Sequence, residues 1–110
     1  MLRIASSAAC ALMMIATSPA AATPGDTHDP ETIVMRNFDF APMIVTVRAG
    51  TTVSWKNMDG EPHTVTSLDG LFRSGALDQD ESFSFKFTKP GTYHYVCTIH
   101  PKMTGEVVVH

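Results

Sequence analysis

The sequence predicts an all-β protein, a Greek-key β-sandwich of seven to eight short strands. Three observations support this fold class. Short runs rich in β-branched and aromatic residues recur along most of the chain, and turn-forming glycine, proline and Asp-Gly signals separate them. No run keeps a helical period for longer than one turn. A chain of this pattern is expected to bury one face of each strand between two sheets.

Each expected strand follows from its own residues and its own boundaries. The first three are rich in valine, isoleucine and threonine, and Gly50 separates the second from the third. Asp59-Gly60 and Asp69-Gly70 enclose the fourth strand, and Pro90-Gly91 separates the fifth from the sixth. The expected strands are residues 32–38, 43–47, 51–55, 64–67, 81–87, 92–97 and 106–109.

Two of these strands alternate clearly between apolar and polar side chains. In residues 81–87, phenylalanines alternate with polar or charged residues, which is typical of a strand with one buried face. In residues 92–97, Tyr93, Tyr95 and Cys97 share one face, while His94 points to the other. We therefore expect Cys97 to face the interior and His94 to face solvent.

The N-terminal segment is typical of a secretory signal peptide. Arg3 precedes an apolar, alanine-rich stretch, and a small-residue cleavage site ends at Ala22. The apolar stretch is too short and too poor in large residues for a membrane span, so we expect export to the periplasm without a membrane anchor. Residues 1–22 are then the signal peptide, residues 23–30 a flexible, Pro/Gly-rich terminus, and residues 31–110 the single folded domain.

Cysteine content and charge narrow the functional classes. Cys10 lies in the signal peptide, and the residues before it do not resemble a lipoprotein site, so Cys97 is the thiol that the exported protein keeps. A free thiol in an oxidising compartment needs a reason, and metal ligation supplies one. After Arg3, seven basic residues against eleven acidic ones give a net charge of −4. The acidic residues are dispersed and no basic stripe exists, so we expect no nucleic-acid partner. We also expect the protein to be a monomer.

The residues that carry chemistry are Cys97, His100 and Met103, spaced three apart in Cys-Thr-Ile-His-Pro-Lys-Met, together with His63 after Pro62. A thiolate, two imidazoles and a weak thioether form the ligand set of electron-transferring copper, because soft sulfur favours Cu(I) and imidazole accepts both oxidation states. Zinc is the rival metal. A structural zinc site needs four strong ligands, however, and a thioether is a poor fourth ligand.

Residues 91–109, which contain this motif, resemble the C-terminal segment of the cupredoxins, and residues 53–65 resemble their segment with the first histidine. Two residues between Cys97 and His100, and two more before Met103, are similar to the short ligand loop of amicyanin, whereas plastocyanins and pseudoazurins have longer loops. The resemblance implies a cupredoxin fold that holds one type 1 copper ion. It implies that His63, Cys97 and His100 are strong ligands and that Met103 is the long axial ligand.

The resemblance also carries expectations about neighbours and partners. Thr64 follows His63, where amicyanin and plastocyanin usually have asparagine, and a threonine hydroxyl lacks the reach of an amide between the two ligand loops. His100 is the expected electron exit, on an apolar rim with Met58, Pro62 and Pro101. By resemblance alone, the redox partners would be an amine dehydrogenase as donor and a cytochrome as acceptor.

The sequence therefore predicts an exported blue copper protein that shuttles single electrons through Cu(I) and Cu(II), and not an enzyme. It shows no catalytic triad, no phosphate loop and no His-x-His pair of the kind that oxygen-reducing copper clusters need. The alternative is a periplasmic copper carrier or storage protein without redox cycling. Such a protein is expected to have exposed Met-rich or His-rich tracts, and the chain has none.

Overall fold

A computed structural model describes residues 31–110 and confirms the predicted all-β sandwich, with eight strands in two four-stranded sheets. The expected signal peptide (1–22), with Cys10, and the expected flexible terminus (23–30) lie outside the described residues. The strands are β1 (Glu31–Arg36), β2 (Asp39–Ala41), β3 (Ile44–Val47), β4 (Thr51–Asn57), β5 (Thr66–Ser67), β6 (Ser82–Phe87), β7 (Gly91–Val96) and β8 (Thr104–Val109). The part of the chain that is described contains no helix that could cross a membrane.

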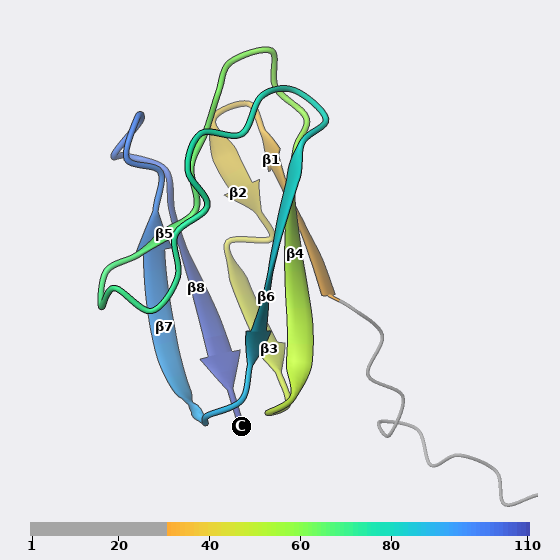
Figure 1. Cartoon of the computed structure of the whole chain (residues 1–110), viewed down its shortest axis with the longest axis vertical. Helices are drawn as coiled ribbons and strands as arrows, with labels where there is room; N and C mark the ends of the chain where they lie inside the picture. The colour runs from red at the N-terminus through yellow and green to blue at the C-terminus, as the bar shows by residue number, and fades with distance from the viewer. Residues whose placement is uncertain (1–30) are drawn as a thin grey trace, which may run out of the picture.

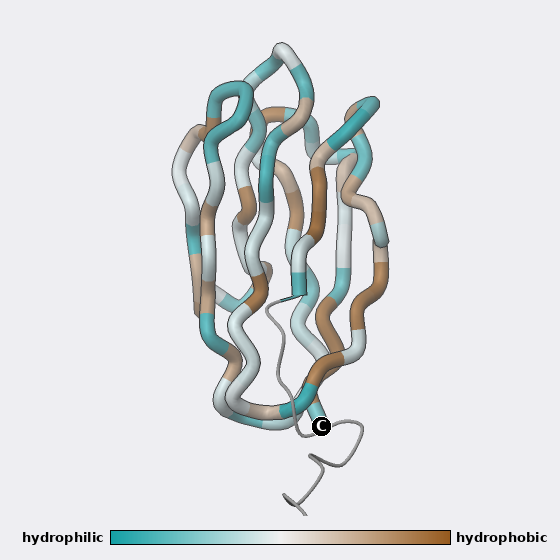
Figure 2. Tube along the Cα trace, turned by 90° about the vertical axis from the view of Figure 1, so that its right-hand side faces the viewer, coloured by the Kyte–Doolittle hydropathy of each residue, from teal (hydrophilic) through white to brown (hydrophobic). Residues whose placement is uncertain are grey.

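The two sheets have strand orders β2-β1-β4-β6 and β3-β8-β7-β5. β1 pairs with β4, and β3 with β8, in parallel, and the other strand pairs are antiparallel. Each connection from β2 through to β7 passes from one sheet to the other, so the sheets are held together by the chain itself as well as by their facing side chains. Figure 2 shows the hydrophobic stretches along the strands, with several hydrophilic loops at one end.

That end, at the top of Figure 1, gathers the β1–β2 turn, the segment between β4 and β5, and the β7–β8 loop, and we call it the upper end. The β3–β4 and β6–β7 turns and the C-terminus lie at the opposite end. Loops that are far apart in sequence therefore meet at the upper end.

The structure corrects two of the expected strands. Residues 32–38 are not one strand: β1 ends at Arg36, and a tight turn leads into the short β2, which pairs back onto it. Asn37 and Phe38 both have positive φ angles, 54° and 59°, as a two-residue hairpin turn requires. Glycine or asparagine usually signals such a turn, and a phenylalanine at its second position hides it. The expected strand at 64–67 is also shorter, because only Thr66–Ser67 forms β5.

Aromatic rings fill the centre of the sandwich. Trp55 packs against Phe72, Phe83, Phe87 and Tyr95, with ring centroids 5.4 to 6.3 Å apart. The Tyr95 ring crosses directly over the backbone of Gly105, the residue paired with it on β8. A β-carbon at position 105 would overlap that ring, so glycine is required there by space and not by backbone conformation.

Candidate metal centre

Three of the four expected ligands converge at the upper end. His63 Nδ1 and His100 Nδ1 are 3.2 Å apart, and Cys97 Sγ lies 3.9 Å from each of them. Metal bonds of about 2.0 Å to nitrogen and about 2.3 Å to sulfur place donor atoms about 3.5 Å apart around a single ion. The observed spacing fits that requirement, so one metal ion can be held by these three side chains. Among residues 31–110 they form a cluster with metal-ligand geometry.

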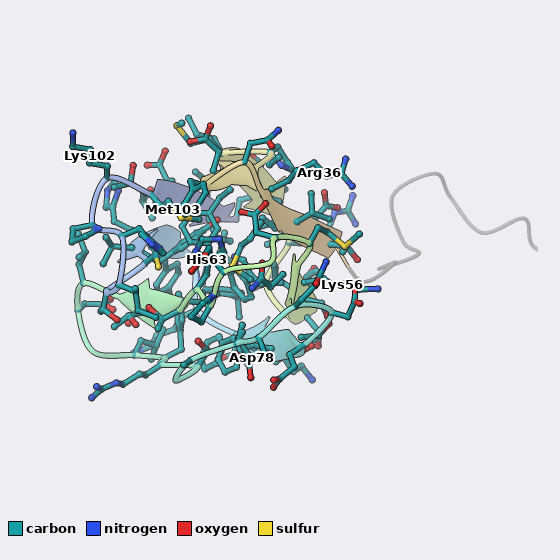
Figure 3. The ribbon with its side chains drawn as sticks, turned by 90° about the horizontal axis from the view of Figure 1, so that it is seen from above. Arg36, Lys56, His63, Asp78, Lys102 and Met103 are labelled. Carbon is teal, nitrogen blue, oxygen red and sulfur yellow. The ribbon has the colours of Figure 1, made fainter. Side chains whose placement is uncertain are left out.

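The β7–β8 loop brings two of these ligands together with Met103. Cys97 directly follows β7 and is fully buried, which confirms the expected inward orientation. Two backbone hydrogen bonds close the loop: Cys97 N–H donates to the Met103 carbonyl at 3.0 Å, and Met103 N–H donates to the His100 carbonyl at 2.9 Å. Met103 is buried at the same end of the sandwich (Figure 3). The backbone of the loop itself therefore fixes the relative positions of Cys97, His100 and Met103.

His63 arrives from the other ligand segment, between β4 and β5. Its backbone exchanges two hydrogen bonds with Leu77, at 3.1 and 2.7 Å, so it sits in an isolated β-bridge and not in a regular strand. The buried Asn57 side chain supports this arrangement by donating to the carbonyls of Glu61 and Leu77 at 2.8 and 2.9 Å. His63 is thus held rigidly and is fully buried.

Thr64 ties the two ligand segments together, although its hydroxyl is shorter than the amide that the resemblance leads one to expect there. Thr64 Oγ1 accepts a hydrogen bond from the Thr98 backbone N–H at 2.7 Å and bonds the Thr98 hydroxyl at 2.8 Å. The Thr64 backbone N–H also donates to Cys97 Sγ at 3.3 Å. The hydroxyl of Thr64 therefore links the segment of His63 directly to the loop of Cys97.

Two neighbours of the ligands were not singled out from the sequence. The ring of Phe38, 46% exposed, packs edge-to-face on His63 and His100, with centroids 5.4 and 4.9 Å away. The carboxylate of Asp59 lies 2.8 Å from His63 Nε2. An acidic residue four positions before a candidate ligand was a signal for Asp59, whereas nothing in the local pattern indicated Phe38.

The environment of Asp59 favours its ionised form. Burial pushes the pKa of Asp59 upward, but hydrogen bonds from the Phe38 N–H, from His63 and from the Asn37 N–H outweigh burial and hold its pKa below the ordinary value. An ionised carboxylate that faces a ligand histidine fixes the orientation of the imidazole ring.

The surface beside His100 is apolar. A cavity of about 390 Å³ is lined by Phe38, Ile99, His100, Pro101, Lys102 and Met103. Met58 and Pro62, expected on this rim, are half-buried and do not line the cavity. Figure 3 shows Arg36, Lys56, Asp78 and Lys102 around the periphery, with His63 and Met103 inside.

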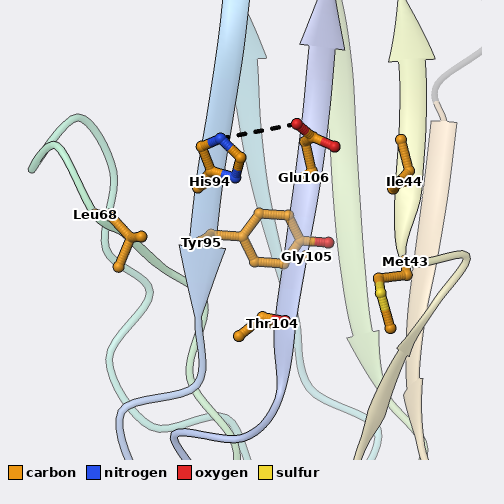
Figure 4. Close-up of a pocket in the computed structure, with 8 residues that line it drawn as sticks. All are labelled: Met43, Ile44, Leu68, His94, Tyr95, Thr104, Gly105 and Glu106. Carbon is orange, nitrogen blue, oxygen red and sulfur yellow. Dashed lines mark ion pairs between the residues drawn. The ribbon is translucent and has the colours of Figure 1, made fainter.

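His94 lies away from the metal centre, as expected from strand parity. Its side chain is 60% exposed on the outer face of the second sheet, where His94 Nε2 lies 3.8 Å from Glu106 on β8. The pair borders a cavity of about 260 Å³ with Met43, Ile44 and Leu68 (Figure 4). This face shares no ligand with the centre at the upper end.

The donor set itself discriminates between metals. One cysteine sulfur and two imidazoles leave the site short of the four strong ligands of structural zinc, while they match the ligands that copper prefers in both oxidation states. His63, Cys97 and His100 are therefore arranged as a copper site.

Comparisons with known proteins agree with this geometry. The model of the cupredoxin-like domain family matches residues 6–109. Amicyanin from Paracoccus versutus is 39% identical over 70 residues, 59% of this chain and 53% of the relative. Plastocyanin from Scenedesmus fuscus is 38% identical over 83 residues, 64% of this chain and 85% of the relative. The chain spans about half the length of the amicyanins that it matches.

Solved structures show the same likeness. The oxidised state of an amicyanin mutant superposes with a TM-score of 0.70 at 30% identity, covering 74% of this chain and 82% of the other. A purple cupredoxin from Nitrosopumilus maritimus gives a TM-score of 0.68 at 30% identity, covering 73% and 99%. A copper-containing nitrite reductase from Thermus scotoductus gives 0.69 at 32% identity, covering 74% of this chain but 22% of the enzyme.

Proposed function

Because this chain belongs to the cupredoxin-like family, we propose that it is an electron carrier in which His63, Cys97, His100 and Met103 hold one type 1 copper ion. The observation that carries the proposal is the convergence of Cys97 Sγ, His63 Nδ1 and His100 Nδ1 within 4.8 Å of one another, in loops fixed by hydrogen bonds. When bound, copper in such a ligand set supplies a one-electron site that alternates between Cu(I) and Cu(II).

The surrounding residues suit a site that changes charge without changing shape. Thr64 connects the segment of His63 to the loop of Cys97, and the backbone of residues 97–103 closes on itself. Ligands that are held in place in both oxidation states lose little energy to rearrangement, which is what a fast electron carrier requires. The thioether of Met103, at the end of the same loop, would complete the proposed ligand set.

His100 provides the proposed path for the electron. It is the partly exposed member of the ligand cluster, and the apolar side chains of Phe38, Ile99 and Pro101 surround it. Electron transfer falls off steeply with distance, so a partner that docks on these three side chains, here called the docking rim, reaches the metal through one imidazole. A mainly apolar rim favours brief docking, because few polar groups must be desolvated and paired. The proposed partners are other redox proteins outside the cytoplasm, with residues 1–22 as the export signal.

The experiment that tests this function is repeated redox cycling of the copper-loaded protein in the presence of a mild chelator. The protein is reduced by ascorbate and reoxidised by an external acceptor, and bound copper is measured after each cycle. We expect full recovery of oxidised protein with no loss of copper. Transfer of the ion to the chelator during the first cycles would contradict electron carriage and favour copper delivery.

The docking rim is tested by Ile99→Glu and Pro101→Glu, which place a charge beside His100. We expect slower electron exchange with an unchanged copper spectrum. Leu68→Glu is the matched control, since Leu68 is an exposed apolar residue at the distant cavity. Equal exchange rates in all three variants would refute this rim.

A further inference from the structure

The two ring nitrogens of His63 have separate tasks. Nδ1 points to the ligand cluster, 3.2 Å from His100 Nδ1 and 3.9 Å from Cys97 Sγ. Nε2 lies 2.8 Å from Asp59 Oδ2 in the opposite direction. A ring nitrogen that faces a carboxylate carries the proton, which leaves the other nitrogen with a free lone pair. The position of Asp59 therefore assigns Nδ1 as the metal-binding atom.

Asp59 is itself fixed from two sides. Its backbone N–H donates to Asn57 Oδ1 at 2.9 Å, and Asn57 is fully buried. Its carboxylate accepts the Asn37 N–H at 2.8 Å and the Phe38 N–H at 3.0 Å. With His63, three donors converge on one carboxylate whose side chain is 13% exposed. Such a side chain has little freedom to move away from the histidine.

The same carboxylate supports an unfavourable turn. Asn37 and Phe38 both occupy the left-handed region of backbone space, and an aromatic residue adopts it only when its surroundings enforce it. The two hydrogen bonds to Asp59 provide that enforcement. The turn in this conformation places the Phe38 ring against both ligand imidazoles. Asp59 thus links the β1–β2 turn to His63 directly. The same turn carries Phe38, which contacts both ligand imidazoles.

We propose that Asp59 is a positioning residue of the metal centre that holds His63 by its Nε2–H, keeps Phe38 over both imidazoles, and favours Cu(II) over Cu(I). This inference rests on the proposed copper site. The preference for Cu(II) follows from charge, because a carboxylate hydrogen-bonded to a ligand imidazole stabilises the more highly charged ion more strongly. Loss of such a partner costs about 10- to 100-fold in metal affinity.

Asp59→Asn tests the proposal, with Glu61→Gln as the matched control. Glu61 is an exposed acid in the same segment, so its variant removes the same charge without touching His63. We expect Asp59→Asn to lose at least tenfold in Cu(II) affinity and to raise the reduction potential. A tenfold loss confined to Cu(II) corresponds to about 59 mV. Glu61→Gln is expected to remain close to wild type. Equal values for the two variants would overturn the proposal.

Nitrogen-15 NMR of the wild-type Cu(I) protein tests the same proposal without a variant. We expect a protonated His63 Nε2 whose hydrogen exchanges slowly with water, because Asp59 holds it. A His63 Nε2–H that exchanges freely, or a protonated Nδ1, would overturn the proposal even if Asp59→Asn did not fold. A wild-type protein that does not bind copper in a coloured form would instead refute the proposed function, so the two failures are distinguishable.

Discussion

The upper end and the centre of this sandwich are held together by different forces. At the upper end, hydrogen bonds of 2.7 to 3.3 Å link the two ligand segments through Thr64, Thr98 and Cys97. In the centre, ring contacts dominate, and the two polar atoms Trp55 Nε1 and Tyr95 Oη have no hydrogen bond of acceptable geometry among the described residues. Hydrogen bonds therefore position the metal-binding atoms of the ligands, whereas the packing of ring side chains organises the centre.

Function and stability should therefore be separable in this molecule. Changes at the upper end are expected to alter the spectrum or the reduction potential of the copper protein more than its fold. Changes in the centre are expected to alter the free energy of unfolding and leave the spectrum of the folded protein intact.

Cys97→Ser should have the largest effect, a complete loss of the intense visible colour after copper loading. The thiolate provides the charge-transfer transition of such a site, and a serine hydroxyl cannot replace it. The fluorescence of Trp55 in the folded centre should remain that of wild type. Visible absorption and fluorescence of the same sample check both parts, and a variant that keeps the colour would break the assignment of Cys97.

Gly105→Ala should destabilise the metal-free protein by about 3 kcal/mol, because the new methyl group overlaps the Tyr95 ring. Gly60→Ala is the matched control: a β-carbon there meets no atom within 4 Å, so its free energy of unfolding should change by less than about 0.5 kcal/mol. Denaturant unfolding measures both. Equal stability of the two variants would show that the space between residue 105 and the Tyr95 ring can accommodate a methyl group.

Thr64→Val should affect both the stability of the fold and the metal centre, but the metal centre more. Valine keeps the shape and removes the acceptor of the Thr98 N–H, which costs about 1 to 3 kcal/mol. We also expect a shifted reduction potential, since the tie between ligand segments is lost. Thr46→Val, on an exposed position of β3, is the control. A wild-type potential in Thr64→Val would show that the ligands keep their positions without this tie.

Met103→Leu should change the potential with little effect on stability. Leucine fills a similar volume, so the free energy of unfolding should change by less than about 1.5 kcal/mol. Removing the electron pair of a weak fourth donor destabilises Cu(II), the more electron-poor ion, and should raise the reduction potential while the colour persists. Voltammetry of the coloured variant is the test, and a potential equal to wild type would refute the axial role of Met103.

Tyr95→Phe should have the smallest effect near neutral pH. Its free energy of unfolding should change by less than about 1 kcal/mol, because the lost hydroxyl has no hydrogen-bond partner within residues 31–110. Burial raises the pKa of Tyr95 to about 12 from 10.0, against a smaller opposing effect of Trp55. The unfolded chain therefore loses the proton first, and stability falls from about pH 10 until about pH 12. The slope from this residue is about 1.4 kcal/mol per pH unit. Unfolding measured across this range should be less pH-dependent in Tyr95→Phe, and an unchanged slope would contradict burial of the hydroxyl.

The sequence predicted the parts of the molecule in which local spacing carries the information. Alternation in residues 92–97 placed Cys97 inside, and its equal steps to His100 and Met103 indicated one loop around one ion. The proline before His63 and the strand-like run after it indicated a ligand fixed at a turn. These features need no knowledge of distant neighbours.

The remaining features depend on contacts across the fold. The β1–β2 turn was missed because its left-handed Phe38 is stabilised by Asp59, which is 21 residues away. The hydrogen bond between Thr64 and Thr98 spans 34 residues, so the sequence showed threonine in place of the usual asparagine but did not show its contact with Thr98. Side chains that act through such contacts become visible only when the loops of the upper end are brought together.

The proposed copper site is tested by the visible absorption and electron paramagnetic resonance of the Cu(II)-loaded protein, followed by reduction with ascorbate. We expect an intense orange-red absorption band, a narrow copper hyperfine splitting and reversible bleaching. A pale protein with the wide splitting of ordinary tetragonal Cu(II) would contradict the proposed site, because His63, Cys97 and His100 would then not hold copper together.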